Sequence, residues 1–127
     1  MSTMTLERLA AFGEAWRRKD VDALMEFVTD DVVYRTSVGP EPGETLRGRD
    51  EVREGFVRML AHDAGAEAQG GPAWIFGDRG VGLWSYVEMR GGQRIEVEGI
   101  DLFEFDGDKI RLKDAYRKTY DEASRPD

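Results

Sequence analysis

The chain has 127 residues, 40% hydrophobic and 35% charged, so it can bury one core, and we expect a single domain spanning residues 1–127. A formal net charge of −8 argues against nucleic acid and anionic membrane surfaces as partners, because both are bound through clustered Lys and Arg. The absence of cysteine excludes disulfides, thiolate nucleophiles and cysteine metal sites, and it fits a reducing cytoplasm.

The first stretch of the chain predicts two helices. The opening MSTMTLERLA lacks the basic and apolar regions of a secretion signal, and no run approaches the roughly 18 apolar residues that span a bilayer, so we expect a cytoplasmic protein. Residues 5–19 are predicted to form a helix with Thr5 as its N-cap and an apolar face made by Leu6, Leu9, Phe12 and Trp16. A shorter helix is predicted to start near Asp20, with apolar residues at helical spacing at Val21, Leu24, Met25 and Val28.

The middle of the chain predicts a short strand, a loop and a third helix. Alternation over residues 32–37 indicates the strand, and VGPEPGE at 38–44 offers two prolines and two glycines as the loop. The helix is predicted to begin near Asp50, with its apolar face at Val52, Gly55, Phe56, Met59 and Leu60. A glycine on that face predicts a close approach to another element at Gly55.

From residue 66 onward the pattern is typical of hairpins. Turn sequences GDRG, RGGQ and DGD separate predicted strands at residues 73–76, 81–89, 94–105 and 109–119. Three N-terminal helices followed by an antiparallel meander indicate an α+β domain in which the helices pack on one face of a curved sheet.

One carboxylate lies in the apolar row of the predicted strand IEVEGIDLFEF at residues 95–105. Alternate positions of this strand are Ile95, Val97, Gly99, Asp101, Phe103 and Phe105. Loss of hydration there would favour the neutral acid and suit Asp101 to general acid or base chemistry. The alternative is a structural ion pair, in which case Arg117 is the cation that we expect on the facing strand, where Arg111, Lys113, Ala115, Arg117 and Thr119 are predicted to share one face.

The order of these elements resembles the cystatin-like cone shared by nuclear transport factor 2, ketosteroid isomerases and SnoaL-type polyketide cyclases. The resemblance rests on AWRRKDVDALMEFVTDDVVY, LRGRDEVREGF and GIDLFEFDGDKI and covers almost the whole chain. It implies an NTF2-like cone with a hydrophobic cavity. It also implies that Asp101 is the functional acid, since the matching Asp of the isomerases is a protonated acid that hydrogen-bonds an oxyanion.

The isomerase residues do not all carry over. The position of the isomerase base falls on Thr36 and that of its oxyanion tyrosine on Phe12, and neither residue can perform those roles. The sequence therefore argues against a true steroid isomerase. Relatives similar to limonene epoxide hydrolase combine Asp with Arg, which implies a catalytic role for Arg117 if its side chain points inward.

The remaining candidates are aromatic or hydroxyl-bearing residues of the predicted cavity. Tyr34 is a candidate catalytic group because a phenol can donate to a carbonyl or hold a water, and packing in the core is the alternative. The predicted substrate-binding residues are Phe12, Trp16, Thr36, Trp84, Tyr86 and Phe103. His62, the only histidine, is expected on the surface, and neither a metal nor a cofactor is expected.

Two functions remain open from the sequence. The first is a cofactor-independent isomerase, cyclase or hydrolase that uses acid–base chemistry on a hydrophobic carbonyl, enol or epoxide compound. The second is a non-catalytic ligand-binding or dimeric scaffold domain. On the opposite face of residues 94–105, Ile100 and Leu102 lie among Glu96, Glu98 and Glu104, and this apolar centre with a charged rim predicts a homodimer through the sheet.

Overall fold

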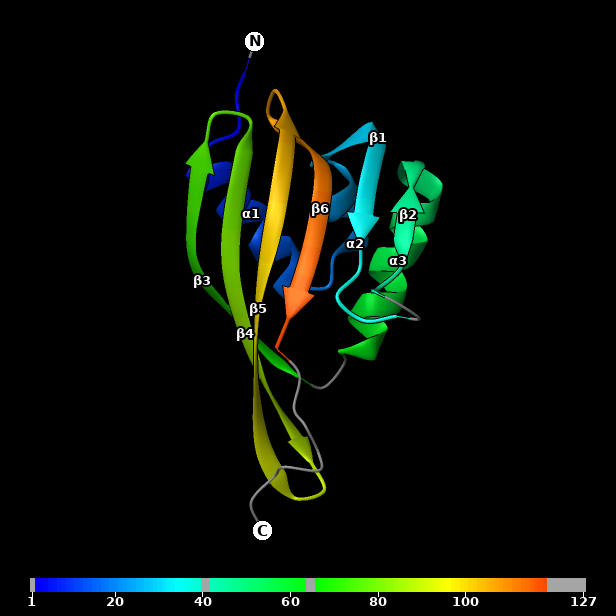
Figure 1. Cartoon of the computed structure of the whole chain (residues 1–127), viewed down its shortest axis with the longest axis vertical. Helices are drawn as coiled ribbons and strands as arrows, with labels where there is room; N and C mark the ends of the chain where they lie inside the picture. Colours follow the sequence, from blue (N-terminus) through cyan, green and yellow to red (C-terminus); the bar gives the residue numbers. More distant parts are fainter. Residues whose placement is uncertain (1, 40–41, 64–65, 119–127) are drawn as a thin grey trace.

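The structure is a computed structural model that describes residues 2–39, 42–63 and 66–118. Within these residues, three helices, α1 (Leu6–Arg17), α2 (Val21–Met25) and α3 (Gly48–His62), pack on one curved six-stranded sheet (Figure 1). The strands are β1 (Val28–Arg35), β2 (Thr45–Arg47), β3 (Glu67–Phe76), β4 (Arg79–Arg90), β5 (Gln93–Asp106) and β6 (Lys109–Arg117). Their order is β2-β1-β6-β5-β4-β3, so the predicted α+β class is confirmed.

Side-chain caps define the starts of the first two helices. The Thr5 hydroxyl accepts a hydrogen bond from the Arg8 amide at 3.1 Å, and the Asp20 carboxylate accepts one from the Ala23 amide at the same distance. The predicted N-cap at Thr5 and the predicted helix start near Asp20 are therefore confirmed. In the described part of the chain, no helix is long and apolar enough to cross a bilayer.

Several boundaries differ from the prediction: β3 begins at Glu67 and not at residue 73, and β1 spans Val28–Arg35 where a strand over residues 32–37 was predicted. Val28 begins β1 and does not extend α2, because β1 already pairs with Ile110 of β6 at that point. The third helix begins at Gly48, two residues before the predicted start. Strand β2 was not predicted, because it has only three residues, too few to show an alternating pattern. It follows the predicted 38–44 loop, of which residues 40–41 lie outside the described residues.

A β-bulge changes the predicted face of β6. Phe105 pairs with Ile110 and Glu104 pairs with Leu112, so Arg111 is an extra residue without a partner on β5. Its side chain binds Glu104 at 2.8 Å, and the prediction that Arg111 shares the inner face is therefore wrong. Thr119 lies outside the described residues.

The core joins the helices to the sheet through aromatic rings. The ring centroids of Tyr34 and Phe56 lie 5.0 Å apart, and those of Phe12 and Phe103 lie 6.3 Å apart. A Cβ atom on Gly55 would lie 2.1 Å from Leu46 Cδ1, so the predicted close approach of the third helix is confirmed. This packing closes the α3 side of the cone.

Candidate functional site

A cavity of about 760 Å³ lies between the helices and the inner face of the sheet. Its volume falls within the range of about 300–1,000 Å³ that is common for small-molecule sites. The sheet leaves this space because many inward positions have small side chains, namely Ala68, Gly70, Gly71, Ala73, Gly82 and Ala115.

The polar, exposed part of the lining indicates where the cavity opens. Arg17 and Lys19 lie at the end of α1, and Glu67 and Gln69 lie at the start of β3; all four are exposed. A ligand would therefore enter between α1 and β3.

Asp101 lies on the wall of this cavity, between two small residues. Its cross-strand neighbours are Gly82 on β4 and Ala115 on β6, neither of which can cover the carboxylate with a side chain. The Asp101 side chain is 12% exposed. The sheet register thus explains how a charge fits in an apolar row: its neighbours leave space beside it.

The cation that pairs with Asp101 is Lys113, not the predicted Arg117. Lys113 Nζ lies 3.3 Å from Asp101 Oδ1, and the lysine side chain is only 6% exposed. The ammonium also lies 4.6 Å from the Trp16 ring centroid and 4.9 Å from that of Tyr34. A carboxylate and two aromatic faces together stabilise the charged form of a buried lysine.

Tyr34 is buried beside this pair. Burial first, and the negative charge of Asp101 second, raise the pKa of its phenol far above the ordinary value. The phenol therefore stays protonated at neutral pH and can serve only in its neutral form.

Arg117 lies at another part of the wall, held by residues of three elements. Its guanidinium donates to Ser37 Oγ at 2.8 Å, to the Tyr86 hydroxyl, and to Asp63 Oδ2 at 3.2 Å. The side chain is 5% exposed, and its charge is balanced by Asp63 at the end of α3. Arg117 thus ties β6 to α3 and to the loop after β1, and sequence reasoning missed Asp63 as its partner.

The predicted substrate-binding residues separate into two groups. The cavity is lined by Phe12, Trp16, Trp84, Tyr86 and Phe103. Thr36 is not part of the lining: its hydroxyl accepts from the Glu44 amide at 2.8 Å and donates to the Val38 carbonyl at 2.7 Å, so it holds the loop after β1. Strand β1 ends one residue earlier, at Arg35, so its alternation of inward and outward side chains does not continue to Thr36.

Trp84 is positioned by the glycine opposite it. Trp84 and Gly99 are cross-strand partners, and a Cβ atom on Gly99 would lie 2.1 Å from Trp84 Cζ2. The indole therefore lies directly over the glycine backbone and stacks on Tyr86, with centroids 6.0 Å apart and the rings 4° from parallel. The Arg117 guanidinium lies 5.5 Å from the Trp84 ring centroid, so a cation also packs against this aromatic wall.

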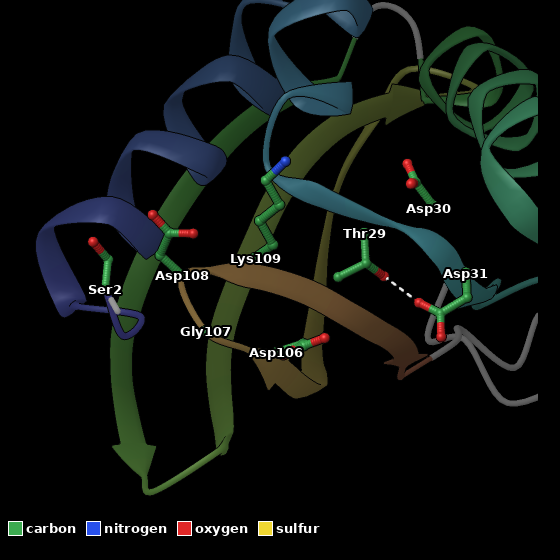
Figure 2. A pocket seen from close by; sticks show the side chains of 8 residues that line it. All are labelled: Ser2, Thr29, Asp30, Asp31, Asp106, Gly107, Asp108 and Lys109. Atoms are coloured by element: carbon green, nitrogen blue, oxygen red, sulfur yellow. Dashed lines mark hydrogen bonds between the residues drawn. The ribbon is translucent and has the colours of Figure 1, made fainter.

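A second hollow, of about 560 Å³, lies at the turn between β5 and β6. It is lined by acidic residues, but Figure 2 shows that the carboxylates of Asp30, Asp31, Asp106 and Asp108 are spread around it and do not converge. Asp31 accepts a hydrogen bond from the Thr29 hydroxyl at 2.7 Å. No three His, Asp or Glu side chains of the described residues gather into a metal-binding group.

The family profile described as a SnoaL-like domain matches residues 9–112. The match covers most of the chain, including Tyr34 and Asp101, and ends one residue before Lys113. The chain therefore belongs to the SnoaL-like domain family. No curated protein is significantly similar to the chain.

Solved structures with this cone include an enzyme and proteins of unknown function. An epoxide hydrolase/cyclase-like enzyme, SalBIII, described in pyran ring formation of the polyether salinomycin, superposes with a TM-score of 0.72 at 19% identity over 89% of each chain. A hypothetical protein with a ketosteroid isomerase-like fold from Catenulispora acidiphila, in complex with trimethylamine, gives 0.69 at 23% identity over 95% of this chain and 90% of that one. An NTF2-like protein of unknown function from Mesorhizobium loti gives 0.72 at 23% identity over 89% of each chain. These similarities show the NTF2-like fold.

Proposed function

We propose that the protein is a cofactor-independent enzyme that performs acid–base chemistry on a hydrophobic carbonyl, enol or epoxide compound. The observation that carries this proposal is the Asp101 carboxylate on the wall of a largely apolar 760 Å³ cavity, with small residues on both sides of it. The description of SalBIII as epoxide hydrolase/cyclase-like supports the same reaction class.

Asp101 would act as the base in the resting enzyme. Its carboxylate lies 3.3 Å from the Lys113 ammonium, so the site holds a pair of opposite charges and differs from the lone neutral acid that the isomerase resemblance implies. Once a bound substrate displaces water from the cavity, the carboxylate would interact strongly with a proton on that substrate. Once protonated, Asp101 would return the proton as a general acid.

Tyr34 and Arg117 would have supporting roles. The Tyr34 phenol, kept protonated by its raised pKa, is a hydrogen-bond donor beside the ion pair. Arg117 would be a positioning residue, because its contacts with Ser37, Tyr86 and Asp63 fix the aromatic wall. Phe12, Trp16, Trp84, Tyr86 and Phe103 would bind the apolar part of the substrate.

Binding and conversion are tested separately. A panel of aromatic ketones, enols and epoxides is screened by thermal shift, and every stabilising compound is incubated with the protein and examined by mass spectrometry. We expect stabilisation and conversion by the wild type, with conversion reduced about 10²–10⁴-fold in Asp101→Asn.

The matched control is Glu104→Gln, which removes a carboxylate from the same strand but from its opposite face. Ala115→Leu provides a second control, because its larger side chain fills the space beside Asp101 and should abolish binding. Stabilisation without conversion would identify a ligand-binding protein, and conversion that Asp101→Asn leaves unchanged would refute the proposed role of this residue.

We also propose that the protein is a homodimer that associates through the outer face of the sheet. Leu83, Ile100 and Tyr116 form one cross-strand row on this face. Leu83 is 40% and Tyr116 50% exposed, and Leu102 on the next row is 39% exposed. Light scattering is expected to give twice the chain mass for the wild type and the monomer mass for Leu102→Lys.

A further inference from the structure

The acid–base function gives no role to the buried Lys113 ammonium. It lines the cavity, and its side chain is 6% exposed. Among the residues that the structure describes, Asp101 is its ion-pair partner, and the rings of Trp16 and Tyr34 are its other recorded contacts, neither of which accepts a strong hydrogen bond. An ammonium has three N–H donors, so it retains donor capacity toward the cavity.

Charge balance makes this lysine important during a reaction. When Asp101 takes a proton, it becomes neutral, and Lys113 loses the negative charge that compensates it. An uncompensated charge in a low-dielectric site is costly. The substrate can replace the lost charge only if its own negative charge develops next to the ammonium.

The second cation of the cavity cannot fill this role without breaking other bonds. Each nitrogen of the Arg117 guanidinium is already bonded, Nε to Ser37 and the other two to Tyr86, Asp63 and the Met59 sulfur. Its charge is also compensated by Asp63 throughout. Of the two cations, Lys113 is therefore the one that loses its negatively charged partner when Asp101 takes a proton.

We propose that Lys113 binds the oxygen of the substrate and exchanges its counter-ion during the reaction, from the Asp101 carboxylate to a substrate oxyanion. This inference rests on the proposed function and narrows the substrate to ketones, aldehydes or phenols that ionise to an enolate or phenolate. In a ketone or aldehyde, the C–H bond next to the carbonyl breaks, its proton forms an O–H bond with Asp101, its electron pair forms a C=C bond, and the π pair of the carbonyl moves to the oxygen. In a phenol, the O–H bond breaks, Asp101 takes the proton, and the electron pair stays on the oxygen. Lys113 keeps its proton, and the net charge of the site is unchanged.

The test uses para-nitrophenol, whose phenolate absorbs visible light and whose neutral form does not. The probe is titrated with protein in slightly acidic buffer, where most of the free probe is neutral. In the wild type, Asp101 takes the phenolic proton and Lys113 pairs with the phenolate, so the absorbance of the ionised probe is expected to rise on binding.

Two variants of the pair give opposite predictions. Asp101→Asn leaves Lys113 without a counter-ion, so its affinity for the phenolate is expected to increase about tenfold or more over the wild type. Lys113→Met is expected to lose the phenolate signal. Glu104→Gln on the outer face is the matched control and should behave as the wild type, and circular dichroism checks that each variant is folded.

The outcomes separate this inference from the proposed function. Binding of the neutral probe by the wild type with no ionisation overturns the counter-ion exchange but leaves the cavity as a ligand site. An affinity for phenolate that does not increase in Asp101→Asn overturns it too, and this result does not depend on the folding of Lys113→Met. If the wild type binds no para-nitrophenol and no member of the ligand panel, both proposals are refuted.

Discussion

The buried ion pair between Asp101 and Lys113 makes a specific prediction about stability. Its atoms lie 3.3 Å apart, and the two side chains are 12% and 6% exposed. At an effective dielectric constant of about 20, this separation corresponds to a Coulomb attraction of about 5 kcal/mol. Desolvation offsets part of this attraction, so we expect a net coupling free energy of about 3 kcal/mol.

A double-mutant cycle measures this coupling. Lys113→Met leaves the Asp101 carboxylate unpaired, and Asp101→Asn leaves the Lys113 ammonium unpaired. Each substitution is expected to lower the free energy of unfolding by about 3 kcal/mol. The double variant removes both charges, so it is expected to cost about 3 kcal/mol, and not the sum of the two. The free energies come from urea unfolding followed by circular dichroism.

The control pair is Glu104 with Arg111, which spans the same two strands. Its distance is shorter, 2.8 Å, but its side chains are 28% and 43% exposed, so we expect a coupling below about 1 kcal/mol. A coupling for Asp101 and Lys113 no larger than that of the control pair would show that the pair is solvated and would refute the reasoning.

Three further predictions concern the wall, the phenol and the first helix. Gly99→Ala should force the Trp84 indole out of place and lower the free energy of unfolding, measured in urea, by about 2 kcal/mol. Gly82→Ala, whose Cβ would meet nothing closer than 3.5 Å, should leave that free energy unchanged. Equal effects of the two substitutions would contradict this packing. Because the folded-state pKa of Tyr34 is raised, its stabilisation is complete below pH 10.0 and is lost as the pH rises above that value. In an absorbance titration, Tyr34→Phe should therefore remove no phenolate signal from the folded protein up to about pH 11. Thr5→Ala should lower the unfolding free energy by about 1 kcal/mol through loss of the N-cap, and an unchanged value would contradict the cap.

Local patterns in the sequence were enough to predict most of the fold. Thr5 and Asp20 followed by apolar residues at helical spacing predicted the first two helices, and alternation with glycine turns predicted the four hairpin strands. The prediction failed where pairing decides the structure. Residues 45–47 become strand β2 only because β1 lies beside them, and the bulge at Arg111 depends on the register between β5 and β6.

The site shows the same limit. The alternation of β5 predicted that Asp101 points inward, and it does line the cavity. Its partner was not predictable, because Lys113 and Arg117 each lie two residues from Ala115, the residue opposite Asp101. Distant parts of the chain decide which cation pairs with Asp101. Asp63 at the end of α3 binds Arg117, and the rings of Trp16 and Tyr34 pack against the Lys113 ammonium.

The central claim is that a ligand oxygen meets Lys113 beside Asp101 inside the cavity. A crystal structure of the protein with para-nitrophenol bound tests it most directly. We predict that the ring lies in the cavity and that the phenolic oxygen lies within hydrogen-bond distance of Lys113 Nζ. A probe bound outside the cavity, or bound within it with its oxygen away from the lysine, would contradict the claim.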